Sequence, residues 1–236
     1  MVRARRFAPV TAISFDADDT LWDFQKAMRH SLALTLKELR RHVADGRADC
    51  LSVNEVIRIR EGVVEEYLGT ANLTAVRLEG FRRTLAAIGV TDETLTHYLT
   101  RFYLSHRFSH IELFPDVVPA LDALLPRFTL GLISNGNTCP DRCGLAGYFR
   151  FVILAEDHGV EKPDSGIFEV AMRQAGCSAD QLLHVGDSLA ADVKGAMDAG
   201  ARAVWLNRQA QPNDSGIMPD YEMATLSGLP ALCDGL

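Results

Sequence analysis

Three aspartates, Asp16, Asp18 and Asp19, stand directly after an apolar run that ends at Phe15. Like charges this close raise one another's pKa, so the cluster is costly unless a cation or a catalytic task stabilises it. Further polar residues follow other apolar runs: Ser134, Asn135, Gly136, Lys162, Gly186, Asp187, Ser188 and Asp192. Taken singly, each fits an ordinary turn, helix cap or solvated charge. Together they match what transfer of a phosphoryl group to an aspartate requires.

Four of these residues are the candidate catalytic groups. Asp16 can attack phosphorus and form an aspartyl-phosphate. Asp18, two residues later, can protonate the leaving alkoxide and afterwards activate water. Ser134 can donate to the phosphate oxygens, and Lys162 supplies positive charge where negative charge accumulates.

The same residues predict where a substrate phosphate binds. The backbone N–H groups around Ser134, in the turn with Asn135 and Gly136, can donate to its non-bridging oxygens. Lys162 completes this set as a fixed positive charge. The expected ligand is a small phosphate ester.

A metal site is predicted at Asp16, Asp18, Asp187 and Asp192. Asp16, Asp187 and a backbone carbonyl near Asp18 offer the hard oxygen ligands that Mg²⁺ prefers, with waters completing the octahedron. Asp192 is expected to orient Lys162 or a metal-bound water. The predicted cofactor is therefore Mg²⁺, which also relieves the repulsion among the carboxylates.

The elements that position these residues alternate between strands and helices. The expected strands are TAISF, FTLGLIS, FRFVILA, LLHVG and ARAVWLN, separated by helical segments such as SGIFEVAMRQAG and LAADVKGAMDAG. This alternation favours a Rossmann-like parallel sheet with helices on both faces. Ligands of such sheets bind beyond the carboxyl ends of the strands, where the polar residues stand. Asp164 is the expected N-cap of the helix after Lys162.

A helical insert interrupts this pattern from Phe24 to about residue 109. Its apolar residues recur at steps of three and four, as at Met28, Leu32 and Leu36, and Ser52 predicts a helix N-terminus there as part of a capping box. We therefore predict an α/β core of residues 1–23 and 110–236 that carries an all-helical cap domain of residues 24–109.

Composition excludes several classes of partner. The 236 residues carry a net charge of -7 and no basic stripe, so nucleic acid is not an expected partner. No apolar run is long enough to span a bilayer, and the start MVRARRF contains no secretory apolar region. Five cysteines without a CxxC pair fit reduced thiols, so a cytoplasmic location is expected. The sequence does not distinguish a monomer from a homodimer.

The motifs FDADDT, LISNG, the Lys of EKP and HVGDSLAADV stand in this order and span nearly the whole chain. In this combination the chain resembles the haloacid dehalogenase superfamily of aspartate-nucleophile hydrolases, in the subfamily with the smaller type of cap. The resemblance implies Mg²⁺ as cofactor, Asp16 as nucleophile and Asp18 as acid and base. It also implies that Thr20, counted with the substrate-binding residues, helps to fix the first loop. The cap of such enzymes closes over the core and selects substrates.

The segment from LISNG to EKP is also similar to the bacterial flavin mononucleotide phosphatases, which are linked to a ribitylamino-pyrimidine phosphate of riboflavin synthesis. Nucleotidases and sugar phosphatases share most of these letters, so they remain alternatives. A row of aromatic and histidine residues in the insert either stacks on such a substrate or packs the helices: His97, Tyr98, Phe102, Tyr103, His106 and His110.

Reactions of other classes are disfavoured on particular residues. Dehalogenases of the family lack the second aspartate and use no Mg²⁺, so Asp18 favours a phosphatase. Phosphonate cleavage needs a poised lysine, whereas Lys26 and Lys37 are expected to face solvent. A phospho-receiver switch would be about half as long as this chain and would have no cap. In a catalytically silent relative we would expect a motif residue to be missing.

Overall fold

The computed structural model describes residues 8–67, 72–107 and 110–236, and the chain forms two compact units. One unit comprises Met1–Trp22 and Leu113–Leu236, and the other comprises Asp23–Glu112. Residues 1–7, from which we excluded a secretory segment, and residue 109, the predicted end of the helical insert, lie outside the described residues.

The first unit, the core unit, is built on a six-stranded sheet in the order β3-β2-β1-β4-β5-β6. Every neighbouring pair of strands is parallel. The strands are β1 (Ala12–Phe15), β2 (Thr129–Ser134), β3 (Phe151–Leu154), β4 (Leu182–Gly186), β5 (Arg202–Leu206) and β6 (Tyr221–Met223). All residues of β1, β4 and β5 are buried, because strands inside a parallel sheet are covered on both faces.

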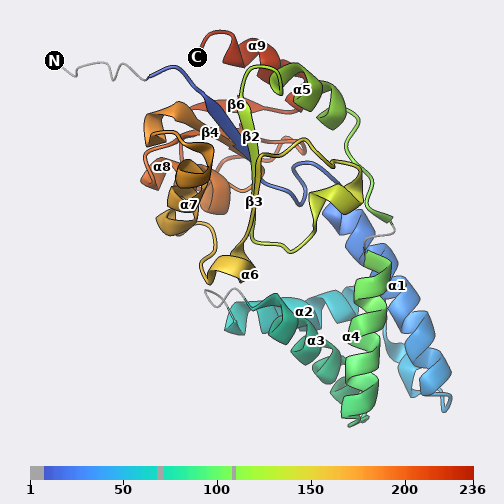
Figure 1. Cartoon of the computed structure of the whole chain (residues 1–236). Coiled ribbons are helices and arrows are strands. Elements are labelled where there is room, and N and C mark those ends of the chain that lie inside the picture. Colours follow the sequence, from blue (N-terminus) through green and yellow to red (C-terminus); the bar gives the residue numbers. More distant parts are fainter. Residues whose placement is uncertain (1–7, 68–71, 108–109) are drawn as a thin grey trace. The chain divides into compact units, whose positions relative to one another are not determined.

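Helices cover both faces of this sheet (Figure 1). On one side α7 (Ser165–Ala175) packs with α8 (Gly195–Asp198), and on the other α5 (Val117–Leu124) packs with α9 (Leu229–Cys233). A short helix, α6 (Ala155–His158), follows β3. The predicted Rossmann-like α/β fold is therefore confirmed, as is the N-cap of α7 at Asp164.

Two segments of the core unit differ from the prediction. The strand β6 has only three residues and none is buried, so no apolar run signals it. The stretch LAADVKGAMDAG, predicted as one helix, begins as a π-helical turn over Leu189–Lys194 and continues as α8. Turns of this kind are rare and occur mostly at functional sites. Asp192 lies in this one.

The second unit, the helical unit, contains α1 (Phe24–His42), α2 (Val53–Glu66), α3 (Leu73–Ala87) and α4 (Glu93–Arg107). Within it α1 packs against α4, and α2 against α3 (Figure 1). The predicted periodic residues Met28, Leu32 and Leu36 are buried in its core. The capping box is confirmed, because Glu55 N–H donates to Ser52 Oγ while the Glu55 carboxylate accepts from Ser52 N–H.

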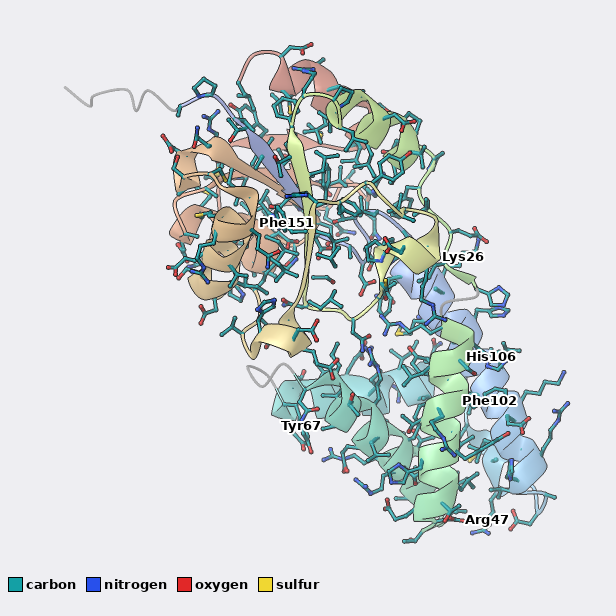
Figure 2. The ribbon with its side chains drawn as sticks, in the orientation of Figure 1. Lys26, Arg47, Tyr67, Phe102, His106 and Phe151 are labelled. Carbon is teal, nitrogen blue, oxygen red and sulfur yellow. The ribbon has the colours of Figure 1, made fainter. Side chains whose placement is uncertain are left out.

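Several side chains of α4 pack within the helical unit, whereas His97 is exposed. Figure 2 shows Phe102 and His106 on this helix, and their rings stack with centroids 4.2 Å apart. Tyr103 lies in the core of the unit. Lys26 and Lys37 on α1 are exposed, as predicted. Within the described ranges, no helix has the length and apolarity needed to cross a membrane.

Candidate active site

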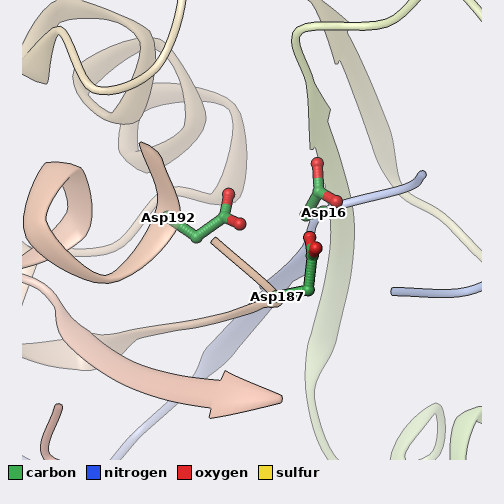
Figure 3. A group of neighbouring side chains, drawn as sticks. All are labelled: Asp16, Asp187 and Asp192. Carbon is green, nitrogen blue, oxygen red and sulfur yellow. The ribbon is translucent and has the colours of Figure 1, made fainter. Parts of the chain in front are cut away.

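Asp16 and Asp187 follow two neighbouring strands, β1 and β4, and so reach the same edge of the sheet. The backbone N–H of Asp16 donates to the carbonyl of Val185 at 2.8 Å, which extends the strand pairing up to the aspartate. Asp192 joins them from the π-helical turn (Figure 3). Carboxylate oxygens of Asp16, Asp187 and Asp192 all lie within 4.8 Å of one another, and we call these three residues the carboxylate cluster.

Two members of the carboxylate cluster, Asp16 and Asp187, are unfavourable to ionise. Burial raises the pKa of Asp16 well above its usual range, despite the opposing charge of Lys162. Burial, reinforced by the charges of Asp192 and Asp19, raises the pKa of Asp187 to about 7. A divalent cation would stabilise the ionised forms, and carboxylate oxygens are the ligands that Mg²⁺ prefers. The donor set therefore fits Mg²⁺.

The ammonium of Lys162 donates three hydrogen bonds inside the protein. Nζ donates to Asp16 Oδ1 at 2.6 Å, to Asp192 Oδ1 at 2.6 Å and to the carbonyl of Ile133 at 3.0 Å. Burial lowers the pKa of Lys162, but the charges of Asp16 and Asp192 outweigh it, so the pKa lies above its usual value. A positive charge is therefore fixed beside Asp16.

Asn135 fixes the backbone that carries this lysine. Its side-chain N–H donates to the carbonyl of Lys162 at 2.8 Å, and its Oδ1 accepts the backbone N–H of Lys162 at 2.7 Å. The side chain, which we predicted to bind substrate, thus ties the turn after β2 to the loop that carries Lys162.

The same turn, which contains Ser134, brings Gly136 next to Asp18. Ser134 Oγ accepts the N–H of Gly136 at 2.9 Å, so its own hydrogen can donate to another group. A Cβ at position 136 would lie 2.6 Å from Asp18 Oδ2, which explains the glycine. The buried Trp22 donates its indole N–H to Asp18 Oδ1 at 2.7 Å. The Asp18 carboxylate is not part of the carboxylate cluster, so its predicted part in metal binding rests on the backbone carbonyl.

Thr20 ends the loop that carries the aspartates, and it is fully buried. Its carbonyl accepts two N–H groups of Arg208, at 2.9 and 3.2 Å. Arg208 also pairs with Asp116 at 2.9 Å, and its guanidinium lies 4.0 Å from the centroid of the Phe114 ring. These contacts hold the loop by the backbone carbonyl of Thr20, and the role expected for this residue stays a prediction.

Three residues near the site carry roles that sequence reasoning missed. His184 is buried, and its ring contacts Ser14 and Asp192. Trp22 and Arg208 hold Asp18 and the loop of Thr20 in the ways just described. The adjacency of β1 and β4 could have pointed to His184, whereas residue spacing carried no signal for Arg208, which lies 188 residues after Thr20.

Comparison with known proteins decides the family. The model of the haloacid dehalogenase-like hydrolases matches residues 10–200. The chain belongs to the haloacid dehalogenase-like hydrolase family. This hydrolase is 28% identical to the 5-amino-6-(5-phospho-D-ribitylamino)uracil phosphatase YigB of Escherichia coli (strain K12), over 97% of this chain and 98% of that protein.

Two solved structures are similar over nearly the whole length of the hydrolase. A 2-haloacid dehalogenase from Pseudomonas syringae pv. Tomato DC3000 aligns with a TM-score of 0.79 at 33% identity, over 96% of this chain and 99% of that one. The HAD-hydrolase YfnB from Bacillus subtilis, bound to magnesium, aligns with a TM-score of 0.78 at 25% identity, over 96% and 100%. Because similar proteins carry both phosphatase and dehalogenase names, the choice between the two reactions must come from the site.

Proposed function

We propose that the hydrolase is a Mg²⁺-dependent phosphomonoesterase that works through an aspartyl-phosphate on Asp16. The observation that carries the proposal is the carboxyl of Asp18, which accepts from Trp22 and lies beside Gly136 in the turn after β2. A phosphate ester releases an alkoxide that needs a proton, and a second carboxyl two residues after the nucleophile can supply it.

The proposed reaction has two steps, which Asp16 and Asp18 carry out. In the first, an oxygen of Asp16 bonds to phosphorus while the bond from phosphorus to the ester oxygen breaks, and Asp18 gives its proton to the departing alkoxide. In the second, ionised Asp18 takes a proton from water as the water oxygen attacks phosphorus. The bond to Asp16 then breaks and inorganic phosphate leaves. The charge of Lys162 and the hydroxyl of Ser134 stabilise the negative charge that accumulates.

Asp16, Asp187 and the backbone carbonyl of Asp18 would hold Mg²⁺, which when bound offsets the charge of the phosphate. Asp192 has a different part in this proposal. Its Oδ1 accepts from Lys162 at 2.6 Å, and its Oδ2 accepts the backbone N–H of Ser188 at 2.9 Å. Both oxygens are engaged by the protein, so Asp192 orients Lys162.

Hydrolysis of a 2-haloacid is the second candidate, favoured by the 33% identity to the Pseudomonas syringae protein. A departing halide needs neither a proton nor a metal ion. That reaction would not need the carboxyl of Asp18 as a proton donor. It would also not need a metal ion to ionise Asp187, whose pKa is raised. We therefore prefer the phosphatase.

Among phosphate esters we propose an intermediate of riboflavin synthesis or flavin mononucleotide. The likeness to YigB over 97% of the chain supports it, together with the resemblance of the segment from LISNG to EKP. Nucleoside monophosphates and sugar phosphates are the alternative substrates. A cytoplasmic location is also proposed, because none of the five cysteines, all of which lie in the described ranges, forms a disulfide.

Phosphate release from a panel of esters tests these proposals. The panel holds flavin mononucleotide, nucleoside monophosphates, sugar phosphates and p-nitrophenyl phosphate, each with Mg²⁺ and with EDTA, and Asp16→Asn is the blank. A parallel assay measures chloride release from 2-chloropropionate. We expect Mg²⁺-dependent phosphate release and no chloride. Chloride release without phosphate release would overturn the phosphatase proposal, and selective turnover of a nucleotide or sugar phosphate would overturn the flavin assignment alone.

A further inference from the structure

Ser14 and His184 form a buried polar pair that contacts Asp192, the partner of Lys162. The pair takes no part in the two proposed chemical steps. His184 in β4 is fully buried, and its Nδ1 lies 2.8 Å from the hydroxyl of Ser14 in β1. Its Nε2 lies 3.2 Å from Asp192 Oδ1. The edge of the ring meets Phe168, with centroids 5.1 Å apart. Burying a polar ring that has no hydrogen-bond partner would cost free energy. The ring of His184 makes a polar contact at each of its two nitrogens.

The fold brings the pair to Asp192 in two ways. Ser14 and His184 are direct partners in the pairing of β1 with β4, so their side chains lie on the same face of the sheet. Gly186 then leaves room for Asp192, because a Cβ at position 186 would lie 2.2 Å from Asp192 Cγ. The π-helical turn places Asp192 in that space.

The chemistry of the partners fixes the direction of these hydrogen bonds. Asp192 Oδ1 accepts from the ammonium of Lys162 at 2.6 Å, and its Oδ2 accepts the backbone N–H of Ser188 at 2.9 Å. Asp192 is therefore a carboxylate, which only accepts hydrogen bonds. His184 Nε2 must carry a hydrogen to make this bond. In the neutral ring, Nδ1 then accepts from the hydroxyl of Ser14.

We propose that His184 is a positioning residue for Lys162, because its Nε2–H, oriented by Ser14, fixes the one oxygen of Asp192 that also holds the ammonium beside Asp16. Asp192 Oδ1 accepts from both His184 and Lys162, so a shift of this oxygen would displace the ammonium. The inference rests on the proposed phosphatase reaction. The charge of Lys162 matters most in the transition state, so loss of the Nε2–H lowers kcat and leaves KM nearly unchanged.

Two amide variants separate this role from mere packing. In His184→Gln the amide nitrogen reaches the place of Nε2, whereas the shorter amide of His184→Asn reaches only the place of Nδ1. His184→Leu fills the space without any donor. We expect His184→Gln to keep kcat within about threefold of the wild type, and the other two variants to lose about tenfold at unchanged KM.

Thermal unfolding of the same variants supplies the control. A packing role predicts that kcat falls in proportion to stability and that the two amides behave alike, and either result would overturn the inference. Where a variant at position 184 does not fold, Ser14→Ala leaves the ring in place and removes its orienting partner. We expect Ser14→Ala to lower kcat by about threefold, and an unchanged kcat would contradict the proposal.

A spectroscopic measurement tests the same geometry without turnover. Nitrogen NMR of the wild-type protein labelled with ¹⁵N in histidine should show a buried ring with its hydrogen on Nε2, assigned by its loss in His184→Gln. A hydrogen on Nδ1 instead would overturn the inference. A wild type with the Nε2 form but no phosphate release would refute the proposed function alone. An active wild type whose kcat is unaffected by His184→Asn would refute this inference alone.

Discussion

The two units of the hydrolase use charged side chains in opposite ways. In the helical unit, ion pairs join Arg82 to Glu79 and Glu93, and Arg83 to Glu66 and Glu79. Both arginine side chains are about 40% exposed, at 41% and 39%. In the core unit, the side chains of Lys162 and Asp192 are each 2% exposed.

The pKa values show what this difference means. A hydrogen bond from Arg83 lowers the pKa of Glu66, and one from Arg82 lowers the pKa of Glu93. The ionised form of these exposed acids is therefore favoured. Burial raises the pKa of Asp187 instead. Exposed pairs of this kind contribute little to stability, whereas buried ones persist mainly where a function requires them. The same residue types thus mark a solvated surface in one unit and a candidate active site in the other.

The largest effect is expected at the nucleophile. Asp16→Asn keeps the shape of the side chain but cannot form the aspartyl-phosphate, so kcat should fall by at least about 10⁴-fold. The variant should still fold, because the amide removes a charge from the buried cluster. Steady-state phosphate release and a thermal melt check the two halves. Turnover within tenfold of the wild type would sink the mechanism.

Asp18→Asn sharpens the contrast between phosphatase and dehalogenase. Loss of the proton donor should lower kcat by about 10²- to 10⁴-fold on an alkyl phosphate. The loss should be smaller on p-nitrophenyl phosphate, whose leaving group departs without a proton. The ratio of the two rates is the measurement, and equal losses on both esters would argue against acid catalysis by Asp18.

Lys162→Ala should affect both activity and stability. Removing the charge beside Asp16 should lower kcat by about 10²- to 10³-fold. It also leaves two buried carboxylates without their cation, which should cost about 3–5 kcal/mol in the free energy of unfolding, measured by urea denaturation without Mg²⁺. Lys26→Ala is the matched control, since its pair with Glu112 is exposed. Equal destabilisation by the two changes would break the comparison between the units.

Stability without Mg²⁺ should decrease as pH rises. The pKa of Asp187 is raised in the folded protein from 3.8 to about 7, so the folded state binds more protons than the unfolded state in that interval. The free energy of unfolding therefore falls between pH about 4 and about 7. Thermal melts in EDTA should show this slope, Mg²⁺ should reduce it, and Asp187→Asn should remove its share. The raised pKa of Asp187 would be contradicted if the stability of the wild type increased over this pH interval while that of Asp187→Asn did not.

The smallest effect is expected in the helical unit. Arg82→Ala removes the ion pairs of a partly exposed arginine with Glu79 and with the exposed Glu93, so the melting temperature should change only slightly and less still in high salt. The melting temperature at two salt concentrations is the measurement. A large, salt-independent loss would mean that this surface pair is no different in kind from the buried one.

Much of the candidate site could be predicted because topology limits where strand ends can lie. Asp16, Ser134 and Asp187 each follow a predicted strand, and parallel strands bring their carboxyl ends to one edge. Lys162 stands just before a helix that Asp164 caps, so its loop had to begin at the same edge. The apolar runs of the buried strands were sufficient for the fold class.

The remaining contacts depend on features that residue spacing does not encode. His184 meets Ser14 through the register of two strands, and register is set by the whole sheet. Arg208 contacts Thr20 through a loop near the end of the chain. The hydrogen bonds of the π-helical turn around Asp192 span one residue more than those of an α-helix, and the pattern of LAADVKGAMDAG indicates only an ordinary helix.

The hydrogen bond from Lys162 to Asp16 joins residues 146 positions apart, and Lys162 lies 30 positions from Asp192. Contacts that close such long loops form late as a chain folds, after the strands that position them have paired. We therefore expect the buried charges to meet only when most of the sheet has formed. Their interactions should then govern how slowly the native protein opens, and should have little influence on how fast it assembles.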